Sequence, residues 1–168
     1  MAVFKAIAKA CRALDVQLLI AHCGLLDARQ VRALESDGAT WVTDFAPQQA
    51  VLSRATLAIT HAGINTALDA LGCGVPMLAL PIAFDQPGVA ARIEHAGAGE
   101  RLSPRRLSAA KVKDTIERLL GDDRYRLRAR VLSEEIRHAG GVTRAADIVE
   151  AVALSAPLST PQPRLEHG

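Results

Sequence analysis

The stretch L-A-I-T-H-A-G-I-N-T-A-L-D-A-L-G-C-G-V-P-M-L-A-L, residues 57–80, holds two short apolar runs separated by a segment with helical spacing. The second run, M-L-A-L, is apolar throughout, which is typical of a strand covered on both faces. Gly74 falls just past the expected helix end, where a left-handed residue is favoured, and Pro76 prevents the helix from continuing. The stretch therefore predicts a strand–helix–strand unit with parallel strands.

The same alternation continues on both sides of this unit. Strands are expected at residues 17–21, 40–43, 57–60, 77–80 and 100–102. Helices are expected at residues 3–14, 27–36, 47–54, 65–71 and 87–96. We therefore predict an α/β fold with a doubly wound, Rossmann-like parallel sheet, in one domain of residues 1–154.

The two ends of the chain depart from this alternation. Helices at residues 109–120, 122–138 and 143–154 are predicted to form a C-terminal helical layer on the sheet, with their arginines on a solvated face. Residues 155–168 are proline-rich and predicted to be a disordered tail. The chain opens in a helix, whereas a doubly wound domain places its first strand centrally, so we expect that the domain lacks its first strand.

Composition narrows the class of protein. The 168 residues are 49% hydrophobic with a net charge of +2, and they carry no basic excess or reading motif, so no nucleic-acid partner is expected. Cys11, Cys23 and Cys73 are widely spaced, which favours buried thiols in a reducing cytoplasm over disulfides or zinc. The histidines lack metal-ligand spacing, and no apolar run approaches the ~20 residues that a membrane span needs. A cytoplasmic protein without metal or cofactor is predicted.

One group of polar residues suits a phosphate. His61 and Gly63 directly follow an expected strand, and Asn65 and Thr66 begin the next helix. Free amides and the positive dipole end attract an anion at a helix start, and Gly63 is expected to open the turn and let the backbone approach the anion closely. A histidine beside them can donate a hydrogen bond to a phosphate oxygen. His22, after an earlier strand, could have a structural or a ligand role, and the structural one is favoured.

A second group suits the other parts of a nucleotide sugar. Phe45 offers a flat ring and Gln48 an amide after one strand, while Asp85 and Gln86 follow another. Asp69 lies one helical turn after Asn65, where a carboxylate suits vicinal hydroxyls such as those of a ribose. Ligands of open parallel sheets bind outside the carboxyl ends of the strands, so these residues are expected at one site.

The order aromatic-x-P-Q, H-x-G-x-N-[ST], a carboxylate eight residues after the histidine, G-V-P and [DE]-Q resembles the donor-binding signature of UDP-dependent glycosyltransferases of the two-domain GT-B type. The further motifs A-L-P-I-A-F-D-Q-P-G-V-A-A-R-I and A-G-G-V-T-R-A-A-D-I-V-E are most similar to family members that glucosylate carotenoids. The resemblance covers nearly the whole chain as the C-terminal, donor-binding half. It implies a UDP-sugar donor, a small lipophilic acceptor such as a carotenoid, and possible contact of the whole enzyme with a membrane surface.

The resemblance also implies roles for individual residues. Phe45 would stack on the uracil in place of a tryptophan, and Gln48 would lie near the ribose, whose hydroxyls Asp69 would bind with a shorter reach than the usual glutamate. His61, Gly63 and the helix start at Asn65 and Thr66 would hold the diphosphate. Asp85 and Gln86 would bind the transferred hexose. The catalytic base would come from an acceptor-binding domain outside this chain, so no residue here is assigned as catalytic and the isolated chain is expected to be inactive. A nucleotide-sugar epimerase and a non-enzymatic nucleotide-binding module remain as alternatives.

Overall fold

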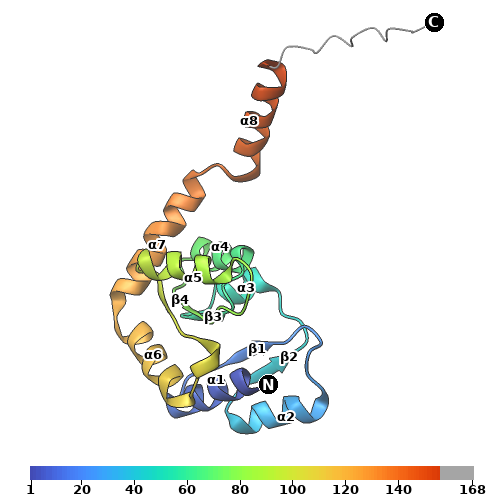
Figure 1. Ribbon diagram of the computed structural model, residues 1–168, viewed down its shortest axis with the longest axis vertical. Coiled ribbons are helices and arrows are strands. Elements are labelled where there is room, and N and C mark those ends of the chain that lie inside the picture. The colour runs from blue at the N-terminus through green and yellow to red at the C-terminus, as the bar shows by residue number, and fades with distance from the viewer. Residues whose placement is uncertain (156–168) are drawn as a thin grey trace, which may run out of the picture.

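The computed structural model describes residues 1–155 as helices arranged around two short parallel sheets (Figure 1). The strands are β1 (Leu19–Ala21), β2 (Trp41–Thr43), β3 (Ala58–Thr60), β4 (Met77–Ala79) and β5 (Gly99–Arg101). The helices are α1 (Ala2–Ala13), α2 (Ala28–Asp37), α3 (Gln48–Leu52), α4 (Ile64–Gly72), α5 (Gln86–His95), α6 (Ala109–Gly121), α7 (Asp123–His138) and α8 (Gly141–Ser155). The predicted alternation is therefore confirmed, with boundaries shifted by one or two residues, and the short 3-10 helix η1 (Pro104–Arg106) was not predicted.

The strands form two separate groups, so the single sheet expected from the sequence is interrupted. β1 pairs with β2, and β4 lies between β3 and β5; every pairing is parallel. β1 lies on the side of its group nearer to β3 (Figure 1), but these two strands are not paired with each other. The gap lies where a doubly wound sheet has its first strand, which is the strand that we expected the domain to lack.

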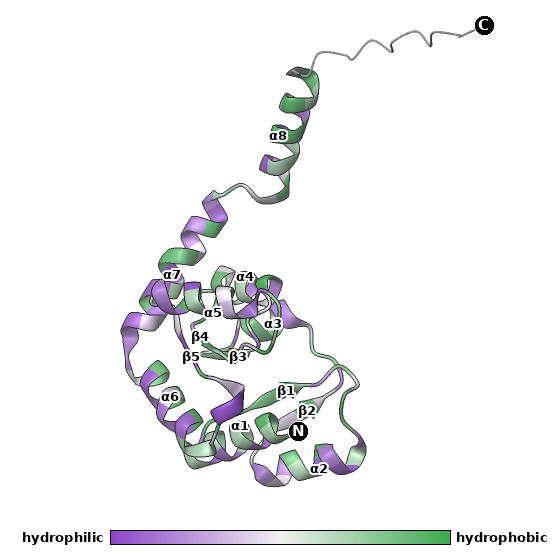
Figure 2. Cartoon of the chain, in the orientation of Figure 1, coloured by the Kyte–Doolittle hydropathy of each residue, from purple (hydrophilic) through white to green (hydrophobic). Residues whose placement is uncertain are grey.

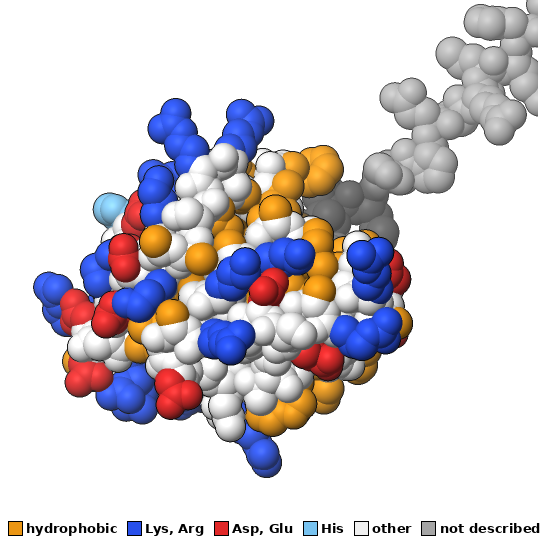
Figure 3. All heavy atoms as spheres, turned by 90° about the horizontal axis from the view of Figure 1, so that it is seen from below, with side chains coloured by type: hydrophobic (Ala, Val, Ile, Leu, Met, Phe, Trp, Pro, Cys, Tyr) orange, Lys and Arg blue, Asp and Glu red, His pale blue; other side chains and the backbone are white. Residues whose placement is uncertain are grey.

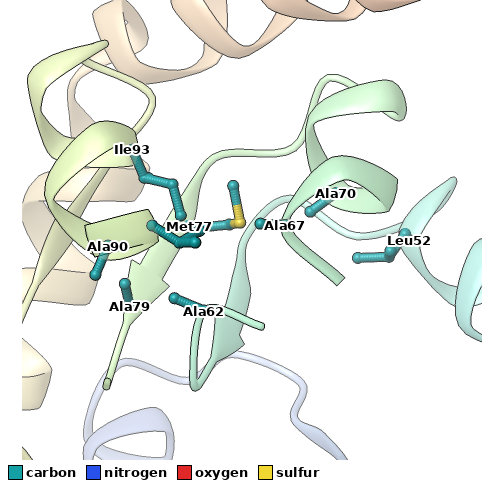
Figure 4. Packing of buried hydrophobic residues seen from close by; sticks show 9 residues of the cluster. Leu52, Ala62, Ala67, Ala70, Met77, Ala79, Ala90 and Ile93 are labelled. Atoms are coloured by element: carbon teal, nitrogen blue, oxygen red, sulfur yellow. The ribbon is translucent and has the colours of Figure 1, made fainter. Parts of the chain in front are cut away.

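The three-stranded sheet is covered by helices on both faces, as a doubly wound fold requires. Alternate side chains of β4 point to opposite faces, because successive residues of a strand do so. Met77 and Ala79 pack in a cluster with residues of α4 and α5 (Figure 4), whereas Leu78 packs in a second cluster with residues of α1 and α6. Both faces of β4 are buried, so its uninterrupted apolar sequence is explained.

Helix α1 connects the two groups of strands. Its residues Ile7 and Cys11 belong to the cluster on the three-stranded sheet, whereas Ala8 packs with Ile20 of β1 and Leu34 of α2. The helix has an apolar stripe wide enough to contact both clusters. Packing on one shared helix thus keeps the two sheets together without a ladder between them.

The C-terminal helices differ from the predicted layer. Helix α6 packs on the sheet through its buried Val112, Ile116 and Leu119, and α7 contributes one buried residue, Ala129. Helix α8 extends away from the body of the protein (Figure 1), and its described side chains are exposed, although many of them are hydrophobic (Figure 2). The prediction that the last helix packs on the sheet is therefore wrong; its hydrophobic spacing shows an apolar surface but not what covers it. Ser155 ends α8, and the rest of the predicted tail lies outside the described residues.

The arginines of α6 and α7 lie on a solvated face, as the sequence indicated, and several of them are in ion pairs. They form the ion pairs Arg118–Glu100, Arg124–Asp122, Arg126–Asp123 and Arg137–Glu134. The face of the molecule in Figure 3 likewise mixes basic and acidic side chains. Exposed pairs of this kind contribute little to stability, because water screens them.

The cysteines are only partly as predicted. Cys11 is buried, and burial raises the pKa of its thiol to about 11, because an apolar environment disfavours the thiolate. Cys23 and Cys73 are exposed, so for these two the prediction of buried thiols is wrong; each lies in a turn at the end of an element. No helix within residues 1–155 is long and apolar enough to cross a membrane.

Glu100 joins three elements at the edge of the sheet. Arg118 of α6 donates two hydrogen bonds to its carboxylate, at 3.1 and 2.7 Å, and the Tyr125 hydroxyl of α7 donates a third, at 2.9 Å. The hydrogen bonds from Arg118 hold the pKa of Glu100 below its usual range, against the opposing effect of partial burial. The carboxylate therefore attaches α6 and α7 to β5 in its charged form.

We expect Glu100→Gln to lower the free energy of unfolding by about 1 kcal/mol at neutral pH. A carboxyl group whose pKa is lowered by folding stabilises the protein above its unfolded pKa, and this stabilisation is lost as the pH falls through the folded pKa. The difference between variant and parent should therefore shrink in acid, which urea unfolding at neutral and acid pH would measure. Glu117→Gln, in an exposed pair with Lys113, is the matched control and should change little at either pH. A difference that stays constant with pH would contradict this role of the Glu100 charge.

Candidate functional site

Three side chains that could bind a ligand or transfer a proton directly follow the ends of strands. His22 follows β1, Asp44 follows β2 and His61 follows β3. In the first sheet the chain moves from β1 outward to β2, and in the second it moves outward from β3 through β4 to β5. The direction of strand addition therefore reverses between β1 and β3, and in open α/β sheets ligands bind at the carboxyl ends beside such a reversal.

The start of α4 offers unsatisfied hydrogen-bond donors. The helix begins at Ile64, one residue before the predicted start, and its N-cap Gly63 provides no side-chain cap. The first backbone bond of the helix runs from the amide of Ala67 to the carbonyl oxygen of Gly63, at 2.9 Å. Within the described residues, nothing accepts from the backbone amides of Ile64, Asn65 and Thr66. These amides and the helix dipole make the end of α4 suited to an anion.

His61 lies against this helix start, and Gly63 makes that possible. A methyl group added to Gly63 would lie 2.6 Å from Nε2 of His61, so any side chain there would displace the imidazole. The expectation that Gly63 opens the turn is wrong, because its φ of −61° is ordinary and the left-handed residue is Ala62, with φ of 66°. The glycine is explained by the close approach of the histidine ring.

Gln48 and Asp69 contact each other across two helices. The amide nitrogen of Gln48 at the start of α3 donates to Asp69 of α4 at 2.6 Å, and Gln49 donates to the other carboxylate oxygen at 3.5 Å. Thr66 donates to the side-chain oxygen of Gln48 at 3.4 Å. Both oxygens of Asp69 keep lone pairs for further donors, such as ribose hydroxyls. Gln49 was not predicted as part of the site; its place next to Gln48 is the only signal for it in the sequence.

Asp85 and Gln86 differ in what they can offer a ligand. Asp85 is exposed at the N-cap of α5 and makes no side-chain capping bond, so its carboxylate can accept from hydroxyl groups. The side-chain oxygen of Gln86 accepts from the backbone amides of Ile82 and Ala83, at 2.9 and 3.0 Å. The side-chain oxygen of Gln86 is thus already occupied. Of the predicted hexose contacts, Gln86 can make those in which its side-chain amide nitrogen donates.

Two phenylalanine side chains close in sequence to these polar residues are exposed to solvent. Phe45, after β2, is 77% exposed, and Phe84, before Asp85, is 94% exposed. Phe84 also has φ of 56°, a left-handed conformation that bulky residues rarely adopt and that often marks functional loops. The sequence analysis singled out Phe45 but missed Phe84, although an aromatic residue directly before a carboxylate in a loop after a strand is a recognisable signal.

A histidine–carboxylate pair was also missed. Nε2 of His22 lies 3.0 Å from Oδ1 of Asp44, and the His22 side chain is buried. The register of β1 and β2 sets Ala21 opposite Thr43, so the residues after these two strands are neighbours. That register cannot be read from the spacing of the two segments, although both residues follow predicted strands. Within residues 1–155 no group of three or more potential ligands could hold a metal ion.

An uncapped helix start at the carboxyl end of a parallel sheet is a common place for anion binding, and similarity to known proteins identifies the family. Residues 4–143 match the family described as UDP-glucoronosyl and UDP-glucosyl transferase. The chain belongs to this family. This family match confirms the resemblance that the donor-binding signature indicated.

Two curated relatives are zeaxanthin glucosyltransferases. That of Pantoea ananas is 48% identical over 149 residues, which are 89% of this chain and 34% of the relative. That of Pseudescherichia vulneris is 42% identical over 147 residues, which are 88% of this chain and 35% of the relative. The chain thus spans about a third of the length of these relatives.

Solved structures of glycosyltransferases share the fold. The calicheamicin glycosyltransferase matches with a TM-score of 0.79 and 31% identity, covering 92% of this chain and 39% of that one. The glycosyltransferase of kitacinnamycin matches with a TM-score of 0.81 and 28% identity, covering 90% of this chain and 39% of that one. The predicted Rossmann-like fold of a GT-B C-terminal domain is confirmed by these matches.

Proposed function

We propose that the chain is the donor-binding half of a cytoplasmic glycosyltransferase that moves a hexose, glucose, from a UDP-sugar to a hydroxyl group of a small lipophilic acceptor such as a carotenoid. The observation that carries the proposal is the uncapped start of α4 with His61 against it, because a diphosphate needs several donors at one place. The acceptor rests on the two zeaxanthin glucosyltransferases among the relatives.

The other residues of the edge fit the remaining parts of the donor. The exposed ring of Phe45 suits stacking on the base, and the Gln48–Asp69 pair suits the ribose hydroxyls. The carboxylate of Asp85 and the amide nitrogen of Gln86 suit hydroxyl groups of the hexose. Apart from Asp69, each of these side chains follows a strand or begins a helix at the carboxyl edge, and Asp69 bonds there to Gln48, so one extended ligand can contact all of them.

In the proposed reaction, an acceptor hydroxyl attacks the anomeric carbon of the sugar and the bond to the diphosphate breaks. Negative charge grows on the departing diphosphate, so donors already aimed at its oxygens stabilise the transition state. Those donors are the imidazole of His61 and the amides at the start of α4. The base that deprotonates the acceptor is assigned to the acceptor-binding domain, because members of the family that the donor signature resembles usually supply it from there.

We expect His61→Ala to weaken the binding of UDP and of pyrophosphate by about tenfold, since a hydrogen bond to a charged group contributes about 1.5 kcal/mol. Calorimetric titration with UDP, UDP-glucose, TDP-glucose and pyrophosphate measures this effect and also the preference for base and sugar. His95→Ala, an exposed histidine at the end of α5, is the matched control and should leave every affinity unchanged. Unchanged UDP affinity in His61→Ala would overturn the assignment, and glucosyl transfer by the chain alone would overturn the placement of the base elsewhere.

A further inference from the structure

A buried imidazole and an exposed carboxylate connect the ends of β1 and β2. The His22 side chain is 2% exposed and that of Asp44 is 77% exposed, yet Nε2 and Oδ1 are 3.0 Å apart. The Asp44 carboxylate stays in water, which screens it, so this contact gains little stability. The pair is therefore better explained by what it positions than by what it adds to stability.

The tautomer of His22 follows from its second contact. The backbone amide of Leu26 donates to Nδ1 at 3.2 Å, so Nδ1 carries no proton. In the neutral ring the proton is then on Nε2, the atom that lies 3.0 Å from Oδ1 of Asp44. Both ring nitrogens have a partner, and the buried ring cannot turn without losing both contacts.

Two further hydrogen bonds restrain the segment that carries Phe45. The amide of Cys23 donates to the carbonyl oxygen of Asp44 at 2.8 Å, and the Thr43 hydroxyl donates to the carbonyl oxygen of Phe45 at 3.1 Å. The Phe45 ring itself is 77% exposed, so packing does little to orient it. Its orientation therefore depends on the backbone of residues 44–45, and the contact between His22 and Asp44 restrains that backbone.

We propose that His22, through Asp44, is a positioning residue that presents the Phe45 ring to the nucleobase of the donor. This role rests on the proposed function, because it supposes that a base stacks on Phe45. Ordering one side chain during binding costs about as much as a twofold to tenfold loss of affinity, and a ring held in place beforehand avoids that loss.

Two substitutions at Asp44 separate the contact with His22 from the charge. Asp44→Ala removes the acceptor and the charge, whereas Asp44→Asn removes the charge but keeps an oxygen that can accept from Nε2 of His22. Since Asp44 is exposed, both variants should fold. We expect Asp44→Ala to bind UDP about twofold to tenfold more weakly, Asp44→Asn to bind like the parent chain, and pyrophosphate affinity to stay the same in both.

A double-mutant cycle tests whether Asp44 acts through the ring. In a Phe45→Ala chain, adding Asp44→Ala should change UDP affinity less than it does in the parent chain. Backbone ¹⁵N relaxation of Phe45 should show greater motion in Asp44→Ala without any ligand. His22→Ala should behave in the same way if it folds, and the Asp44 variants decide the matter if it does not.

The outcomes separate this role from the proposed function. Failure of the parent chain to bind UDP overturns the proposed function and this role with it. UDP binding that is equal in Asp44→Ala and the parent overturns the role of His22 alone. Equal weakening in the Ala and Asn variants, or a full effect of Asp44→Ala without the Phe45 ring, also overturns it.

Discussion

Replacing Met77 by alanine should lower the free energy of unfolding by about 2–5 kcal/mol, the usual cost of truncating a large buried side chain. Met77 is fully buried, and its side chain lies between β4 and the helices α4 and α5 (Figure 4). Many of its neighbours there are alanines, such as Ala67 and Ala70, whose short side chains on rigid helices cannot fill the space left by the thioether. The substitution therefore leaves a cavity as well as losing buried apolar surface.

Urea unfolding followed by circular dichroism measures this loss. The midpoint should fall with little change in the slope, because the surface exposed on unfolding is nearly the same. Leu154→Ala is the matched control, since this leucine on α8 is 87% exposed, and it should change the stability by less than about 0.5 kcal/mol. A loss below about 1 kcal/mol for Met77→Ala would contradict the tight packing on this face of the sheet.

Phe45→Ala should weaken the binding of UDP by about 1–3 kcal/mol, or roughly fivefold to more than a hundredfold, which is the range for an aromatic ring stacked on a base. Thermal stability should hardly change, because the Phe45 ring is mostly in solvent. Pyrophosphate has no base, so its affinity should be the same in the variant and the parent. Calorimetric titration with both ligands separates the contribution of the ring from that of the phosphate donors.

Trp41→Ala is the control for loss of an exposed ring, because Trp41 is 51% exposed but begins β2, whereas Phe45 follows the end of that strand. It should leave UDP affinity unchanged, and Phe45→Trp should retain it. Equal losses at Phe45 and Trp41 would show that the base does not stack where we propose.

Much of the fold could be predicted because its signals are local. Gly74 and Gly97 end helices in the left-handed conformation, with φ of 69° and 70°, as their positions after helical segments indicated. Ser108 caps α6 by accepting from the amide of Lys111. The gap between β1 and β3 could be expected only from the general rule for doubly wound sheets, and the exposure of α8 could not be expected at all, because amphipathic spacing does not identify a partner.

The sequence predicted which residues belong to the candidate site, but it predicted the contacts between those residues less well. Sequence reasoning named His61, Asp69 and Phe45 from their positions after strands and in helices, and these roles remain predictions. It could not foresee that Gln48 bonds to Asp69, 21 residues away, or that the oxygen of Gln86 is taken by its own loop. Such contacts depend on how α3 and α4 pack and on loop conformation, which nearest-neighbour signals do not encode.

The sequence by itself determined the alternation of strands and helices, the apolar faces of β4 and the polar residues at the strand ends, because each follows from periodicity and from turn chemistry within a few residues. Only the tertiary structure decided that Gly63 is needed for the ring of His61, that the helix start of α4 is uncapped, and that His22 holds Asp44. Those features join segments that are distant in the chain or depend on backbone angles. They are fixed by the register of neighbouring strands and by helix packing, which arise only when the whole domain folds.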